Sequence, residues 1–307
     1  MKHYSVLLHE SIEGLKINPD GVYVDATLGY GGHSGQILKR IKKGFLFAFD
    51  QDEDALHFSQ EKLKEVSQNF KLIDANFVKL KDELNKEGIS LVDGIIFDLG
   101  LSSPQIDEAT RGFSFQQDAK LDMRMDKRQK LTAKTVVNEY TEEELTKIFF
   151  NYGEENFSRS IARNIVKART KEIIDTTLKL VDIIKASVPM QYYIKSSPQR
   201  QIFQAIRIEV NNELKALETA LNEAIMLLKP GGRLCVITFH SLEDRIAKVI
   251  FKKYSEINPL VKGLPEIPDE FKPLIKLINR KPILPSEEEI KANPRSKSAK
   301  LRIIERL

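Results

Sequence analysis

The segment Asp25-Ala-Thr-Leu-Gly-Tyr-Gly-Gly-His33 indicates the architecture of this 307-residue chain. It directly follows an apolar run at 21–25. Glycines at the end of a strand let the backbone approach a bound ligand closely, at the point where the next helix begins. The segment therefore predicts a strand, a glycine turn and a helix, with a binding site at the turn.

Similar runs of β-branched and aromatic residues lie at 44–50, 71–74, 92–98 and 233–239. Each is strand-sized and more nearly continuously apolar than alternating, which is typical of strands buried on both faces. Helix-length segments such as 54–65 lie between the early runs. This alternation predicts an α/β fold with a parallel sheet, and the run 301–307 is expected to be its final strand.

The middle of the chain has a different pattern. From 108 to 207 we find no strand-like run, only apolar residues at helical spacing and turns rich in Arg and Lys. A helix at 211–228 then ends at Lys229-Pro-Gly-Gly232. We therefore expect a core formed by 1–107 and 208–307, with 108–207 as an inserted helical domain.

Composition excludes several classes of protein. The single cysteine, Cys235, rules out an internal disulfide and a cysteine-cage zinc site, and it fits a reducing cytosol. No apolar run approaches the ~18–20 residues of a membrane helix. The formal net charge is only +4, so any nucleic-acid surface must be a local patch. We expect a soluble cytoplasmic protein without a membrane association or a required metal.

Two carboxylates are expected beside the glycine turn. Asp50 ends the second predicted strand, about 20 residues after Gly31, where a carboxylate binds the hydroxyls of an adenosine ribose. Asp98 ends the fourth, and the carboxyl ends of parallel strands line one crevice. Asp50 suits NAD and S-adenosylmethionine equally. The spacing acidic-x-x-x-Gly-x-Gly favours an S-adenosylmethionine-dependent methyltransferase, because Ser34 stands where a nicotinamide fingerprint needs its third glycine.

Matches to one family then extend over nearly the whole chain. The sequence resembles the bacterial 16S ribosomal RNA cytidine-N4 methyltransferases. The matching blocks lie at 3–10, 25–34, 98–105, 111–115, 121–126, 152–155, 161–163, 203–208, 212–214, 228–232, 239–245 and 293–295. One departure is Ser197-Pro198, where the family usually has a His-Pro pair.

The resemblance implies a fold, a cofactor and a substrate. The fold would be a class I, Rossmann-like methyltransferase sheet, mostly parallel with an antiparallel last strand, plus a helical substrate-recognition domain. The substrate would be a cytidine in the decoding region of 16S ribosomal RNA in the small ribosomal subunit, methylated at its exocyclic N4. The residues that would contact S-adenosylmethionine are Gly31, Gly32, His33, Asp50, Phe77, Asp98 and Gln105.

Roles in catalysis and RNA binding follow as hypotheses. Asp98 and the segment Ser102-Ser103-Pro104 are expected to line the methyl site, because acceptors there can hold the amino group of the target base. Basic and aromatic residues are candidates for holding an extruded base and its phosphates. These candidates are Arg111, Phe113, Phe115, Arg124, Arg163, Arg207, His240 and Arg295.

Other functions remain open at this point. A DNA amino-methyltransferase would carry Asp/Asn-Pro-Pro-aromatic where this chain has Asp98-Leu-Gly-Leu. A ribosome-assembly factor could keep the fold without the chemistry, although the glycine turn, Asp50 and Asp98 argue against it. Phe239-His240-Ser241 lacks a hydrolase nucleophile elbow, and Ser241 is predicted to cap a helix. The sequence leaves open whether the protein forms a homodimer.

Overall fold

The computed structural model describes residues 5–101, 105, 108–257, 261 and 265–307. Contacts between Cα atoms divide the chain into two compact units. The first combines Met1–Gly100 with Leu214–Leu307, and the second, Leu101–Glu213, interrupts it. These limits lie within about seven residues of the expected domain boundaries.

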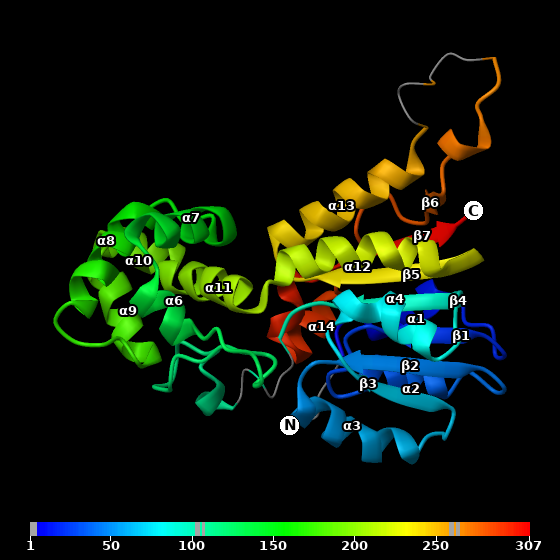
Figure 1. The fold of residues 1–307 in the computed structure, drawn as a ribbon, viewed down its shortest axis with the longest axis horizontal. Helices are drawn as coiled ribbons and strands as arrows, with labels where there is room; N and C mark the ends of the chain where they lie inside the picture. Colours follow the sequence, from blue (N-terminus) through cyan, green and yellow to red (C-terminus); the bar gives the residue numbers. More distant parts are fainter. Residues whose placement is uncertain (1–4, 102–104, 106–107, 258–260, 262–264) are drawn as a thin grey trace. The chain divides into compact units, whose positions relative to one another are not determined.

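The first unit is built on a seven-stranded sheet with the order β3-β2-β1-β4-β5-β7-β6 (Figure 1). Strands β1 to β5 are parallel, whereas β7 is antiparallel to both β5 and β6. The fold-class prediction, including the antiparallel strand near the end of the chain, is confirmed. The strands are β1 (Val22–Asp25), β2 (Phe45–Asp50), β3 (Phe70–Asp74), β4 (Val92–Asp98), β5 (Leu228–Thr238), β6 (Ile275–Leu277) and β7 (Lys300–Arg306).

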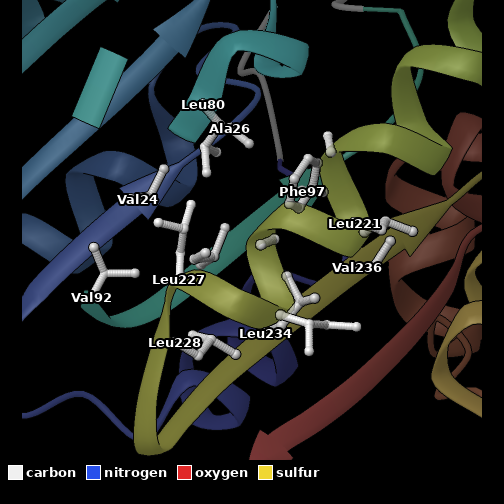
Figure 2. Packing of buried hydrophobic residues seen from close by; sticks show 14 of the residues in the cluster. Val24, Ala26, Leu80, Val92, Phe97, Leu221, Leu227, Leu228, Leu234 and Val236 are labelled. Carbon is white, nitrogen blue, oxygen red and sulfur yellow. The ribbon is translucent and has the colours of Figure 1, made fainter. Parts of the chain in front are cut away.

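Two apolar clusters cover the two faces of this sheet. Within β4, Ile95 and Phe97 belong to one cluster and Ile96 to the other, because successive side chains point to opposite faces. Figure 2 shows Phe97 and Val24 packed in the first cluster with Leu221 of a covering helix. One face is covered by α4 (Leu80–Lys86), α12 (Glu213–Leu227) and α13 (Ser241–Ser255), and the other by α1 (Leu8–Leu15), α2 (Gly32–Leu38) and α3 (Glu53–Lys64).

The β6 strand was not predicted from the sequence. It has three residues and lies among prolines, so it lacks the length and the apolar pattern of the other strands. Its partner decides its structure: Ile275 pairs with Arg306 and Leu277 with Ile304 of β7. The remaining elements among the described residues of this unit are η1 (Phe77–Lys79), η4 (Asp269–Phe271), α14 (Glu287–Ala292) and η5 (Pro294–Ser298).

The second unit is helical. Its described elements are η2 (Ala109–Arg111), α6 (Ala133–Glu139), α7 (Glu142–Gly153), α8 (Ser158–Arg169), α9 (Thr177–Ala186), α10 (Met190–Ser196) and α11 (Pro198–Asn211). The core of this unit includes Leu145, Phe149, Ile161 and Ile206, all fully buried. Across the described ranges of both units, no helix is long and apolar enough to cross a membrane.

Candidate cofactor-binding site

Asp25, Asp50 and Asp98 end three adjacent parallel strands, β1, β2 and β4. Since parallel strands place their carboxyl ends at the same edge of a sheet, the three side chains lie along one rim. The sequence predicted Asp50 and Asp98 as site residues, but it gave Asp25 no role beyond its place in the motif. The signal for Asp25 was its position at the strand end, equivalent to that of the other two.

The glycine turn between β1 and α2 has the backbone conformation that its sequence predicts. Gly29 and Gly31 have positive φ angles of 49° and 67°, which side-chain-bearing residues rarely adopt. A Cβ atom on Gly31 would also lie 3.3 Å from the Leu63 side chain of α3. The chain turns sharply here, because the Gly31 N–H donates to the carbonyl of Leu28, and α2 begins at Gly32.

Asp25 is the innermost of the three carboxylates, with 1% of its surface exposed. Its Oδ2 accepts a 2.7 Å hydrogen bond from the Ser34 hydroxyl, and its Oδ1 accepts one from the Thr27 N–H. Burial raises the pKa of Asp25 to about 6, and these hydrogen bonds oppose the shift. Ser34, the residue that broke the nicotinamide fingerprint, therefore helps to hold a buried carboxylate.

Asp50 ties the glycine turn to the end of β2. Its Oδ2 accepts a 2.9 Å hydrogen bond from the Gly29 N–H, and its Oδ1 accepts one of 2.9 Å from the Asp52 N–H. Both oxygens keep a lone pair for a further donor, as the two hydroxyls of a ribose require. Burial raises the pKa of Asp50 to about 6, with smaller contributions from the negative charges of Asp52 and Asp25.

Asp98 has an oxygen that no described residue satisfies. Although 23% of its side chain is exposed, Oδ1 is buried and accepts no hydrogen bond within the described ranges. Its Oδ2 lies 3.5 Å from Nδ1 of His33, the predicted cofactor residue in the first turn of α2. An orphaned acceptor at the rim suits a bound group that brings its own N–H, O–H or positive charge.

Further carboxylates make this part of the rim strongly acidic. Burial, followed by the charges of Asp25, Glu243 and Glu289, holds the pKa of Asp98 well above its usual range. Glu243 lies in the first turn of α13 and Glu289 in α14, where its Oε1 accepts from the Leu7 N–H at 2.8 Å. Neither glutamate was predicted as a site residue, because their proximity to Asp98 arises only in the folded chain.

Phe77 begins η1, directly after the end of β3. Its ring is partly buried against the sheet and meets Phe97 edge-to-face, with 5.6 Å between the ring centroids. The turn before it is held by Asn76, whose Nδ2 donates to Oε1 of Gln51 at 2.7 Å, next to Asp50. Phe77 thus presents an apolar surface beside the proposed ribose site, where an adenine ring needs one.

His240, predicted as a substrate contact, is the N-cap of α13. Its Nδ1 accepts from the Glu243 N–H at 3.4 Å, and the Glu243 carboxylate accepts from the His240 and Phe239 N–H groups. The prediction that Ser241 caps this helix was wrong by one residue. The imidazole completes the reciprocal capping arrangement that a serine or threonine usually supplies, since its ring nitrogen is the acceptor.

Two parts of the predicted site cannot be placed on this rim. Ser102, Ser103 and Pro104 lie outside the residues that the structure describes. Gln105 is described and buried, and it belongs to the second unit. The methyl-site role of Ser102, Ser103 and Pro104 and the cofactor role of Gln105 remain predictions.

Several of the predicted RNA-binding residues in the second unit are used for internal contacts. Arg111 is only 6% exposed and donates from Nη2 to the carbonyls of Arg124 and Met125. Phe113 is buried in the helical core, 5.9 Å from the Arg111 guanidinium. The segment 118–126 is irregular, and Arg124 forms paired hydrogen bonds with Asp122.

The other candidates vary in exposure. Phe115 packs partly buried against Phe203, and Arg207 forms a two-pronged ion pair with Glu213, 2.9 Å at each contact. Arg163 is exposed and lies 3.6 Å from Glu142. Arg295 is exposed in η5. Of this set, exposure favours Arg163 and Arg295 as RNA contacts.

The rim fits S-adenosylmethionine on the observations above. The positive φ angles of Gly29 and Gly31 form a tight backbone turn at the rim, Asp50 can accept from a ribose, and the orphaned Asp98 oxygen lies among carboxylates that favour a cation. With the strand order, these features define a class I methyltransferase. The chain belongs to the MraW methylase family, whose profile matches residues 1–307. Its cofactor is S-adenosylmethionine.

A relative of similar length agrees with this assignment. The chain is 53% identical over 308 residues to the ribosomal RNA small subunit methyltransferase H of Limosilactobacillus fermentum, covering 99% of this chain and 98% of the relative. Among solved structures, it is similar to an rRNA methylase from Streptococcus thermophilus (TM-score 0.45, 13% identity, 100% and 99% coverage). A Streptococcus mutans protein in complex with SAH gives a TM-score of 0.44, with 15% identity and 100% coverage of both chains.

Proposed function

We propose that this protein transfers a methyl group from S-adenosylmethionine to the exocyclic N4 of a cytidine in 16S ribosomal RNA of the small ribosomal subunit. The 53% identity over nearly the full length of a ribosomal RNA small subunit methyltransferase H supports small-subunit ribosomal RNA as the substrate. The acidic rim at Asp98 supports the chemistry. When bound, S-adenosylmethionine supplies a methyl group on a positively charged sulfonium.

The first task of the rim is to hold the donor. Asp50 accepts from the ribose hydroxyls, Phe77 lies against the adenine, and the turn at Gly31 admits the rest of the ligand close to the backbone. Asp25 and Asp98 then place negative charge near the sulfonium. Burying these negative charges without a partner costs free energy, which is why burial raises the pKa values of Asp25 and Asp98. A cationic ligand offsets that cost.

The second task is to position the cytosine amino group. Its lone pair is delocalised into the ring, so N4 is a weak nucleophile until an acceptor holds its hydrogens. Asp98 has a free acceptor oxygen for one N4–H. As the N4–methyl bond forms and the sulfur–methyl bond breaks, N4 loses one proton. A carboxylate with a raised pKa is a suitable acceptor for it. The main requirement is alignment, with N4 ~3–3.5 Å from the methyl carbon.

The proposal is tested with small ribosomal subunits from cells that lack this protein. The subunits are incubated with the enzyme and methyl-labelled S-adenosylmethionine, and the RNA is digested to nucleosides. We expect the label in N4-methylcytidine. Label in a different nucleoside, or in DNA supplied in parallel, would contradict the proposal. No label in any nucleic acid would favour the assembly-factor alternative.

A further inference from the structure

We infer that a basic and aromatic stripe on α3 and on the segments that flank α2 docks single-stranded RNA next to the target nucleotide. The stripe consists of Tyr30, Lys39, Arg40, Phe58 and Lys62. It lies in the first unit, outside the helical unit in which the sequence placed most RNA contacts. The inference rests on the proposed function, since it concerns the same RNA substrate.

The first observation is an unusual density of uncompensated charge. The sequence Lys39-Arg-Ile-Lys-Lys43 follows α2, and all of its basic side chains are exposed. Within the described ranges, none of these cations forms a salt bridge, and neither does Lys62 of α3. Arg40 donates only to the neutral carbonyl and amide oxygens of Gln36.

Some other exposed lysines of the same unit are each paired with a carboxylate. Lys64 contacts Glu61, Lys71 contacts Glu87 and Lys86 contacts Glu83, at 2.7–3.0 Å. A helix C-terminus alone favours basic residues, and this explains part of the run at 39–43. It does not explain why a cation from another helix joins them.

That cation is Lys62. Helix α3, which carries Lys62, packs against α2 (Figure 1). Burial and then the charge of Lys39 lower the pKa of the Lys62 ammonium. Like charges held together without a carboxylate destabilise the free protein slightly, whereas a bound polyanion relieves the repulsion.

The second observation is an exposed aromatic side chain beside these charges. Phe58 is 56% exposed on α3, and its ring contacts Tyr30, with 4.4 Å between centroids and a 56° interplanar angle. With more than half of its surface exposed, the Phe58 ring is accessible to a ligand. Nucleobases stack on such rings while lysines and arginines bind the phosphates, which is the arrangement that single strands require.

The third observation links the stripe to the cofactor. Lys62 Nζ donates to the Tyr30 carbonyl at 2.7 Å, and Ser59 Oγ of the same helix donates to the Gly29 carbonyl at 2.7 Å. Tyr30 therefore belongs both to the glycine turn and to the stripe. RNA bound along α3 passes the rim where methyl transfer takes place, so the stripe can present a strand that flanks the target base.

The test compares charge reversal on the stripe with charge reversal elsewhere in the same unit. The double variant Lys39→Glu/Arg40→Glu changes exposed residues that make no ion pair. The matched control, Lys215→Glu/Lys248→Glu on α12 and α13, makes the same change in net charge at exposed positions that form no salt bridge within the described ranges. A second stripe variant, Phe58→Ala, removes the ring without changing the charge. The measurements are KM and kcat with small subunits, and the Kd for S-adenosylmethionine by calorimetry.

We expect both stripe variants to raise the KM for small subunits about tenfold, with kcat and the Kd for S-adenosylmethionine unchanged. The double stripe variant should also weaken the salt dependence of KM more than the control does. An equal rise in KM for stripe and control would show that only net charge matters and would overturn the inference, as would an unchanged KM in both stripe variants. If the wild-type enzyme does not methylate the subunits, the proposed function itself fails.

Discussion

The backbone N–H of Gly29 donates a 2.9 Å hydrogen bond to Oδ2 of Asp50, which joins the glycine turn after β1 to the end of β2. The same carboxylate accepts from the Asp52 N–H through Oδ1. Asp50 therefore shapes the turn before any ligand binds, and it keeps acceptor capacity for a ribose. The Asp50 side chain thus both stabilises the turn and is available to bind the ribose.

This dual role predicts the effect of Asp50→Asn. The amide has one acceptor atom instead of two, so it must lose either a backbone partner or a ribose hydroxyl. We expect the Kd for S-adenosylmethionine to rise at least about tenfold, measured by calorimetry. Asp82→Asn provides the control, because Asp82 is an exposed residue of α4 and does not end a strand. An equal loss of affinity in both variants would contradict the assignment.

Asp98→Asn separates catalysis from stability. Burial and the neighbouring carboxylates raise the pKa of Asp98, which means that its negative charge destabilises the folded protein. Because Asp98→Asn removes this charge, the melting temperature at pH 8 should increase. Methyl transfer should fall at least about 100-fold, because the amide cannot take the N4 proton. Melting curves and single-turnover rates measure the two effects, with Asp82→Asn on α4 as the control. Turnover near that of the wild type would exclude Asp98 from the reaction.

Asp25 should make stability depend on pH. Its pKa is about 6 in the folded protein and 3.8 in the reference state, so the folded state binds more protons between these values. The free energy of unfolding contributed by Asp25 therefore decreases as pH rises from about 4 to about 6, by about 3 kcal/mol at most. Asp25→Asn removes this term.

The difference in melting temperature between Asp25→Asn and the wild type should thus shift in favour of the variant as pH rises through this range. Carboxylates paired with arginine, such as Asp122 and Asp244, have lowered pKa values and act in the opposite direction. Because these carboxylates are present in both the variant and the wild type, their effect cancels in the difference in melting temperature. A difference that does not change between pH 4 and pH 7 would show that Asp25 is not responsible.

The charge of the donor gives a separate pH effect. The carboxylates Asp25 and Asp50 become ionised as pH rises through about 6, and the ionised forms attract the sulfonium. We expect the affinity for S-adenosylmethionine to increase between pH 5 and pH 7 more than that for S-adenosylhomocysteine, whose sulfur is neutral. Calorimetry with both ligands at each pH measures the difference. Parallel pH profiles would mean that the rim does not sense the sulfonium.

Arg111 is expected to act in folding rather than in RNA binding. Its guanidinium donates to the buried carbonyls of Arg124 and Met125, which Arg111→Ala would leave without a donor. The free energy of unfolding should decrease by about 1–3 kcal/mol. At a temperature where the variant is folded, its KM for small subunits should equal that of the wild type. A raised KM in the folded variant would restore the role in RNA binding predicted from the sequence.

The parallel strands and the rim carboxylates Asp50 and Asp98 were predictable from local sequence. Strands buried on both faces are continuously apolar, and a carboxylate at a strand end is recognisable by its position alone. The glycine turn was predictable because positive φ angles require Gly29 and Gly31. These features depend on residues close together in the chain.

Only the tertiary structure decided which charges meet. The charges of Glu243 in α13 and Glu289 in α14 act on Asp98, Lys62 of α3 donates to the Tyr30 carbonyl, and Arg111 donates to a backbone carbonyl of its own unit. The residues next to an arginine or a glutamate in the sequence do not show whether its side chain faces solvent or a partner. Its environment depends on the packing of distant segments, because long flexible side chains take the contacts that the folded chain brings within reach.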